Sequence, residues 1–340
     1  MSGFDIIRRN VEFDNPERVG LRFPSLGVSD ILRLYVQLPR RFRTDSAQVR
    51  MDRKPRPALG GFDEWGCRWD SAPTAGHSNM GQVTYHPLRE WAMLSTYPFP
   101  DPSDPSLFDG LEEALAGADG RYVQLNSPFC LFERMHFLRG LEALLTDLYL
   151  HPAQVHALAD RVIEYQLGVV QQAQRLGRGR IHCFDTTDDW GSQTQLFIRP
   201  EMWREFFRPR YKRLFDAVHA AGMHVRFHTD GKVNAILEDL VELGVDIINI
   251  HQPRLLGIEE VGAQLAGRVC FEASVDVQAT LPGGDRQAIE REVHDLVAHW
   301  ASPRGGLIGV EYREVDAINA PREILQWELE AFRRYGTWHD

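Results

Sequence analysis

Short runs rich in β-branched and aromatic residues alternate with amphipathic helical stretches from about residue 120 to the end of the chain. Each run precedes a helical pattern, such as Pro200–Ala221 or Arg286–Trp300. The six runs are Tyr122–Asn126, Arg180–Thr186, Met223–Thr229, Asp246–His251, Arg268–Ser274 and Gly306–Arg313. Two more strands are expected upstream, from Val19–Phe23 and from either Ile31–Val36 or the segment around Asp63–Trp69. The pattern therefore predicts eight strand–helix units.

Eight such units predict an α/β fold, the (β/α)₈ TIM barrel, with an open doubly wound sheet as the alternative. Residues 38–106 hold many of the prolines and show little periodicity, so we expect a loop-rich excursion, an insertion or lid over the barrel mouth. No linker, repeat or like-charge block interrupts the chain, which favours one domain over residues 1–340.

Polar residues share one face of the predicted strands. In the run from Met223, alternation places His224, Arg226 and His228 on one face, with Val225 and Phe227 on the other, where covering helices would pack. Active sites of TIM barrels lie at the carboxyl ends of the strands, so the polar strand ends are expected to surround one cavity. These residues are Asn126, Asp185, His228, Asp230, His251, Glu272, Glu311 and Arg313.

Two imidazoles and a carboxylate form the sharpest group within that set. His228, Asp230 and His251 come from adjacent predicted strands and suit a divalent metal, with zinc preferred over iron(II) or manganese. Glu272 or Glu311 would complete the coordination shell. The competing interpretation is that His228 and Asp230 orient a substrate carboxylate or each other.

Three acids follow the strand that ends near Thr186. Asp185, Asp188 and Asp189 lie within five residues, and clustered carboxylates raise one another's pKa, which suits a general acid or base or an anchor for a substrate amine. A hydrogen-bonded turn that caps the next helix is the alternative.

Composition narrows the classes of function. Thirty-eight basic against 48 acidic residues give a net charge of −10, which disfavours a nucleic-acid-binding face or a membrane surface. Four dispersed cysteines predict reduced thiols in a cytoplasmic protein, and no signal peptide or apolar stretch of membrane-spanning length is present. The sequence holds no GxGxxG after a strand, no Walker A motif and no GxSxG elbow.

Several segments together resemble the uroporphyrinogen decarboxylase (URO-D) superfamily, most strongly over residues 135–335. They are Asp188–Gln193, Pro200–Phe206, Pro209–Lys212, His228–Gly231, Asn249 with Gln252-Pro253, Asp276–Gln278 and Gly305-Gly306, with Arg8-Arg9 and Phe13–Val19 near the start. The resemblance implies a TIM barrel and specifies the superfamily rather than the reaction.

Departures from that family point to an environmental branch that resembles the corrinoid-linked methyltransferases. True porphyrinogen decarboxylases carry an early Met-Arg-Gln-Ala-Gly-Arg-Tyr segment whose arginines hold substrate carboxylates, but this chain reads Phe23–Gly27 there and Arg313 where a last-strand histidine would align. The methyltransferases bind zinc through His-x-Cys and a distal Cys. This chain keeps His228 but has Asp230 for the first Cys, which implies a harder, oxygen-rich site, and a corrinoid protein is the partner implied.

Three hypotheses follow. The first is metal-assisted methyl transfer on a small carboxylated or methoxylated metabolite, with the metal on His228, Asp230 and His251 and with Arg313 pairing a substrate carboxylate. The second is a metal-free decarboxylase in which Arg226 or Arg313 holds carboxylates and Asp63 or Asp185 stabilises a protonated intermediate. The third is a non-catalytic barrel that binds a corrinoid or a partner protein. The oligomeric state is open, and a homodimer is compatible with the sequence. The expected catalytic residues are Asp185, Asp188, Asp189, Glu311 and Arg313, and the expected substrate contacts are Asp63, Asn126, Arg226, Gln252 and Glu272.

Overall fold

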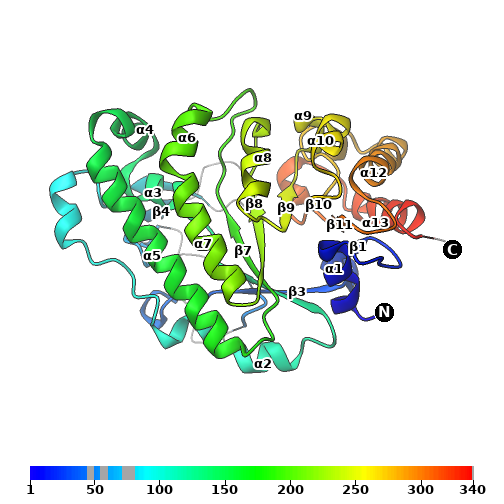
Figure 1. Cartoon of the computed structure of the whole chain (residues 1–340), viewed down its shortest axis with the longest axis horizontal. Helices are drawn as coiled ribbons and strands as arrows, with labels where there is room; N and C mark the ends of the chain where they lie inside the picture. Colours follow the sequence, from blue (N-terminus) through cyan, green and yellow to red (C-terminus); the bar gives the residue numbers. More distant parts are fainter. Residues whose placement is uncertain (44–49, 54–59, 71–80, 339–340) are drawn as a thin grey trace.

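A nine-stranded, mostly parallel sheet curls into a nearly closed barrel with helices around it (Figure 1). The computed structural model describes residues 1–43, 50–53, 60–70 and 81–338. The predicted (β/α)₈ fold is therefore confirmed over the described residues. The strand order is β2-β1-β11-β10-β9-β8-β7-β6-β3, and only β2 runs antiparallel to its neighbour. The sheet strands are β1 (Gly20–Phe23), β2 (Val28–Ser29), β3 (Ile31–Tyr35), β6 (Tyr122–Asn126), β7 (Cys183–Thr187), β8 (His224–His228), β9 (Ile247–Ile250), β10 (Cys270–Ala273) and β11 (Leu307–Val310).

The helices cover the outside of the barrel; α7 packs against β8, and α5 packs against α7 (Figure 1). Apolar side chains on the outer face of the strands hold the helices in place. The ring of Phe227 on β8, for example, packs against Tyr211 and Phe215 of α7, as the alternation of β8 predicts. The helices are α1 (Gly3–Glu12), α2 (Leu111–Ala116), α3 (Phe132–Arg139), α4 (Leu141–Leu150), α5 (Pro152–Gly177), α6 (Pro200–Phe206), α7 (Arg208–Ala220), α8 (Asn234–Glu242), α9 (Pro253–Leu256), α10 (Ile258–Leu265), α11 (Thr280–Gly283), α12 (Arg286–Trp300) and α13 (Glu323–Tyr335). Short 3₁₀ turns are η1 (Pro24–Leu26), η2 (Arg40–Phe42), η3 (Trp91–Thr96), η4 (Pro105–Phe108) and η5 (Val315–Ile318).

Two details differ from the predicted elements. The expected helix over Pro200–Ala221 is two helices, α6 and α7, because Pro209 in the first turn of α7 has no N–H and its ring clashes with the carbonyl four residues earlier. The first predicted strand–helix unit has no α-helix, since β1 reaches β3 through η1 and β2. Ile31–Tyr35 is the second barrel strand, whereas the alternative segment leads into the separate hairpin of β4 (Arg68–Asp70) and β5 (Gln82–Tyr85).

The barrel has a seam between β1 and β3, which stand at opposite ends of the parallel ladder. Asp30 bridges the seam locally: its backbone N–H donates to the carbonyl of Leu21, and its carboxylate accepts from the backbone N–H of Leu21, both at 2.8 Å. The Arg18 guanidinium donates to both oxygens of that carboxylate, at 2.7 and 2.8 Å. Side-chain interactions thus replace a backbone ladder at this point.

The amino-terminal end of the barrel is closed by apolar side chains. Ile7 and Val11 of α1 pack against a buried cluster that also contains Cys183, Ile247 and Ile308 from the strands. Helix α1 begins with a capping box between Ser2 and Asp5, which satisfies backbone donors of its first turn. The cavity described below opens at the opposite, carboxyl end of the strands.

The described part of residues 38–106 packs beside α3 and α5. Trp65 contacts the ring of Tyr165 on α5, and Trp69 contacts Phe137 on α3, each edge to face. Asp52 and Arg53 reach the pocket at the barrel mouth. A lid role for this segment, and the single domain, stay predictions. Among the described residues, no helix has the length and apolar character needed to cross a lipid bilayer.

Candidate active site

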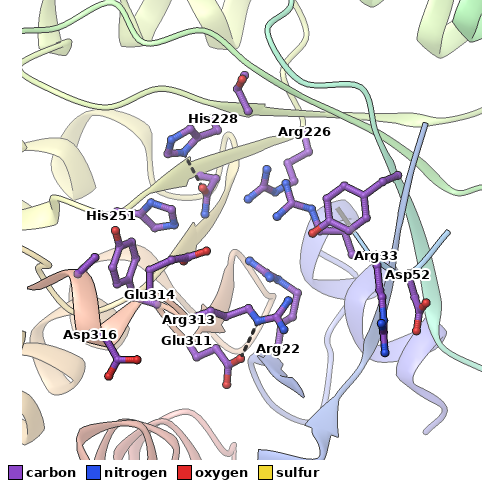
Figure 2. Close-up of a pocket in the computed structure, with 16 residues that line it drawn as sticks. Arg22, Arg33, Asp52, Arg226, His228, His251, Glu311, Arg313, Glu314 and Asp316 are labelled. Carbon is purple, nitrogen blue, oxygen red and sulfur yellow. Dashed lines mark hydrogen bonds and ion pairs between the residues drawn. The ribbon is translucent and has the colours of Figure 1, made fainter. Parts of the chain in front are cut away.

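A cavity of about 620 Å³ opens at the carboxyl ends of the barrel strands. That volume falls in the range of small-molecule sites. His228 and His251 lie side by side on one side of it, and Arg22, Arg33 and Arg226 lie on the other (Figure 2). The lining residues come from β1, β3, β7, β8, β9, the segment after β11 and residues 52–53: Arg22, Arg33, Tyr35, Asp52, Arg53, Thr187, Arg226, His228, Asn249, His251, Glu311, Tyr312, Arg313, Glu314, Asp316 and Ala317.

An ionic layer forms the floor of this cavity. The Arg226 guanidinium donates from Nε and Nη2 to the two oxygens of Glu272, at 2.7 and 2.9 Å, and from Nη1 to Asp185. Arg22 donates to Glu272 at 2.7 Å, and Arg33 donates to Asp185 at 2.6 Å. Both carboxylates are fully buried, so this layer sits inside the barrel beneath the mouth.

The two carboxylates of the floor are ionised at neutral pH. Burial alone would raise the pKa of Glu272, but the positive charges of Arg226 and Arg22 hold it well below its usual range. Burial acts in the same direction on Asp185, and Arg226 with Arg33 lowers the pKa of Asp185 below its usual value. Neither group is therefore suited to donate a proton at neutral pH.

The predicted metal ligands converge on the other side of the cavity. The Nε2 atom of His228 lies 3.6 Å from Asp230 Oδ2, and the Nδ1 atom of His251 lies 3.9 Å from the same oxygen. One ligand atom from each residue lies within 4.8 Å of the others. These separations exceed hydrogen-bond lengths and approach the spacing of about 3.4 Å expected for tetrahedral ligands about 2.1 Å from one ion.

Hydrogen bonds prepare His228 for this role. Asn249 Nδ2 donates to the backbone carbonyl of Glu272 at 2.9 Å, so its Oδ1 faces His228 and accepts from Nδ1–H at 2.7 Å. The proton is thereby fixed on Nδ1, and the lone pair of Nε2 points toward Asp230. A metal-ligating histidine usually donates its other ring N–H in this way.

Among the described residues, no Lys or Arg pairs with the carboxylate of Asp230. Its Oδ1 atom is buried and accepts no hydrogen bond from the described residues. Burial raises the pKa of Asp230 to about 6, with the Asp189 carboxylate adding to the increase and His228 opposing it. Burial holds the pKa of His251 well below its usual value, and the Arg226 guanidinium acts in the same direction, so His251 is neutral, as a metal ligand must be. These features fit a divalent cation.

The two acids that follow β7, Asp188 and Asp189, have different roles. Asp188 is fully buried and accepts the backbone N–H groups of Leu131, Phe132 and Glu133 at 2.7–3.1 Å, as well as the Tyr211 hydroxyl at 2.6 Å. It therefore caps the first turn of α3, and the structure does not bring it to the cavity. The Asp189 side chain is 45% exposed, accepts the backbone N–H of Asp230 at 3.0 Å, and lies 3.6 Å from His228 Nε2.

The remaining predicted residues are also placed. Glu311 lines the cavity and accepts the N–H and hydroxyl of Ser25, and Arg313 beside it is 56% exposed. Both amides are buried: Asn126 donates to the carbonyl of Asp185 and so joins β6 to β7, and Gln252 accepts the N–H of Gly231 and so holds the loop after β8.

Asp63 lies apart from the mouth. Its carboxylate accepts four hydrogen bonds, from the backbone N–H groups of Trp65 and Cys67, the Trp69 indole and Arg134, at 2.8–3.2 Å. With its acceptor positions filled, it anchors the β4 region to α3 instead of contacting a substrate.

The expected set of site residues did not include Arg22, Arg33 or Asn249. A signal for the two arginines was available, because the alternation applied to Met223–Thr229 also places Arg22 and Arg33 on the inward faces of β1 and β3. Asn249 stands two residues before His251, on the same face.

Comparisons with known proteins agree with this architecture. The model of the family "Uroporphyrinogen decarboxylase (URO-D)" matches residues 86–309, about two thirds of the chain. A curated uroporphyrinogen decarboxylase from Anaeromyxobacter dehalogenans (strain 2CP-C) is 24% identical over 203 residues, which cover 58% of this chain and 53% of that protein. The chain thus spans about half the length of this relative. A methyltransferase from Methanosarcina mazei superposes with a TM-score of 0.61 at 14% identity, covering 80% of this chain and 76% of that one, and shares the fold.

Proposed function

Because the chain belongs to the uroporphyrinogen decarboxylase (URO-D) family, we propose that it is an enzyme that binds a small carboxylated or methoxylated metabolite in the barrel mouth and transfers a methyl group with the help of a divalent metal. The observation that carries this proposal is the convergence of His228, Asp230 and His251, with the buried Asp230 Oδ1 left without a hydrogen-bond partner among the described residues. Zinc is the preferred ion for two imidazoles and a carboxylate.

The metal would be held by His228 Nε2, Asp230 and His251 Nδ1. When bound, it would supply Lewis acidity that stabilises negative charge on the oxygen or sulfur that loses or gains the methyl group. The chain's own residues fix the rest of the site. Asn249 keeps the His228 lone pair directed at the ligand cluster, and Asp189, exposed beside that cluster, is placed to accept a proton from the methyl acceptor at its carboxylate.

The opposite side of the mouth would hold the substrate. Arg313 lines the cavity with a side chain that is 56% exposed, and its Nε atom lies 3.7 Å from Glu311, farther than a hydrogen bond. Its N–H groups would therefore pair with a substrate carboxylate. A corrinoid protein as the methyl-carrying partner, a cytoplasmic location and a homodimer stay predictions from the sequence.

A second candidate function is metal-free decarboxylation. The specific observation that favours it is the group of arginines beside the cavity, which suits a substrate with several carboxylates. In that reaction the arginines would hold the carboxylates that stay, and Asp185 would stabilise positive charge on a protonated intermediate.

Metal content separates the two candidates. We expect protein purified without chelators to contain one zinc or iron per chain by mass spectrometry, and His228→Ala to lose it while keeping its circular dichroism spectrum, because a side chain at the mouth contributes little to the core. His294→Ala, a matched control at an exposed position on α12, should keep the metal. Wild-type protein without stoichiometric metal that releases CO₂ from a carboxylated substrate would establish the second candidate instead.

A further inference from the structure

Positive charge is in excess around the cavity. Four guanidinium groups, those of Arg22, Arg33, Arg226 and Arg313, face three buried carboxylates, those of Asp185, Glu272 and Glu311. The acids at the rim do not balance this excess, because Asp52 is paired with Arg50, Asp316 is paired with Arg322, and Glu314 is exposed to solvent. An uncompensated buried cation is costly, so the floor favours an anion above it.

Unused hydrogen-bond donors show where that anion would bind. Arg226 donates from all three of its nitrogen atoms, Nε, Nη1 and Nη2, to carboxylates of the floor. Arg22 is buried, and its Nε has no partner among the described residues. Arg33 donates only from Nε within the described part of the chain, and its guanidinium is 23% exposed at the cavity wall. Among the described residues, Arg22 and Arg33 therefore keep more unused N–H donors than Arg226 does.

These donors occupy two separate positions. Arg33 lies on β3, at one end of the strand order. Arg22 lies on β1, on the other side of the seam, and β1 pairs with β11. The backbone carbonyl of Arg22 accepts the N–H of Glu311, which follows β11 directly. Arg22 therefore lies near Arg313, two residues farther along the chain. Figure 2 shows Arg22 and Arg313 close together, with Arg33 on the far side. A ligand with two anionic groups would satisfy both positions at once.

We propose that Arg33 on one side, with Arg22 and Arg313 on the other, forms a two-point subsite for a small dicarboxylate. The substrate would lie across the barrel seam with one carboxylate at each point. This inference rests on the proposed function only for the reacting end of the substrate, which would face His228 and His251. The subsite itself needs no metal.

Calorimetric titration tests the subsite with succinate, acetate and inorganic phosphate as probes. We expect succinate to bind the full-length protein as purified, and acetate to bind about tenfold or more weakly because it reaches one point only. Arg33→Met and Arg313→Met should each lower succinate affinity about tenfold or more and bring it toward that of acetate. Arg304→Met, at an exposed position outside the cavity, should leave succinate affinity unchanged.

The controls keep the two proposals separable. Asp185 retains Arg226 when Arg33 is replaced, and Arg313 is exposed, so both variants should melt close to wild type; the Arg313 result decides alone if the Arg33 variant unfolds. His228→Ala should lose metal yet keep succinate binding. Equal binding of acetate and succinate, tighter binding of phosphate, or unchanged succinate affinity in Arg313→Met would overturn the dicarboxylate subsite and leave the metal proposal standing.

Discussion

Replacement of Arg226 by methionine is the strongest single test of the ionic floor. The Arg226 side chain is 2% exposed and is the only group among the described residues that pairs with both Asp185 and Glu272. Removing one partner of a buried ion pair costs about 3–5 kcal/mol, because the remaining charge stays buried and unpaired. Here Asp185 keeps Arg33 and Glu272 keeps Arg22, so we expect the lower end, about 3 kcal/mol.

That loss converts into a measurable melting shift. An unfolding entropy of about 2.1 cal/mol/K per residue gives about 0.7 kcal/mol/K for 340 residues, so about 3 kcal/mol lowers Tm by about 4 °C. Arg226→Lys keeps the charge but loses the two-pronged contact with Glu272, and its loss should be smaller. Calorimetry and urea unfolding provide the measurement, with exposed Arg291→Met as the control. A loss below about 1 kcal/mol in Arg226→Met would show that the floor does not depend on this pairing.

Two further predictions concern positioning and pH. Asn249→Leu removes the acceptor that fixes the His228 tautomer and should weaken zinc affinity about 10–100-fold in a chelator competition assay, with the circular dichroism spectrum unchanged. Burial raises the pKa of Glu292 on α12 from 4.5 to about 6, so the protonated form favours folding, and its contribution, full below pH 4.5, is lost as the pH rises through 6. Urea titrations at pH 4 and 7 should show wild type losing about 2 kcal/mol relative to Glu292→Gln; a constant difference between the two proteins would contradict the shift.

The alternation of side chains along each strand, called strand parity below, accounts for most of the site residues that the sequence predicts correctly. Alternation in β8 assigns Arg226 and His228 to the cavity and Phe227 to the helices, and the structure has them there. Parity works because the barrel fixes which face is inward wherever a strand forms. It does not tell a ligand-binding acid from a structural one: Asp188 and Asp189 are adjacent in sequence, yet one caps α3 and the other lies beside His228.

The roles of other residues depend on contacts between distant parts of the chain, which strand parity does not predict. Asp63 satisfies two backbone N–H groups of its own turn, but its roles in holding Trp69 and Arg134 depend on how residues 60–70 pack on α3. By contrast, the break of the predicted helix Pro200–Ala221 into α6 and α7 could have been predicted from Pro209 alone, because a proline inside a helical pattern interrupts the helix. The pairing of Arg33 with Asp185 joins residues far apart in the chain and requires the barrel itself.

The ionic floor also accounts for a barrel that stays closed without a continuous ladder. Its ion pairs join strands that are not all neighbours: Arg33 on β3 to Asp185 on β7, Arg226 on β8 to Glu272 on β10, and Glu272 to Arg22 on β1. Arg226 links the two carboxylates, so one chain of charges runs from β3 across the interior to β1, the two strands that flank the seam. Salt bridges in the interior are only slightly screened, and each ion pair here is also a hydrogen bond, so this path constrains the seam where backbone pairing is missing. A dicarboxylate bound at Arg33 and Arg22 would add a second bridge between the same strands, and substrate binding would then stiffen the part of the barrel that its own ladder leaves open.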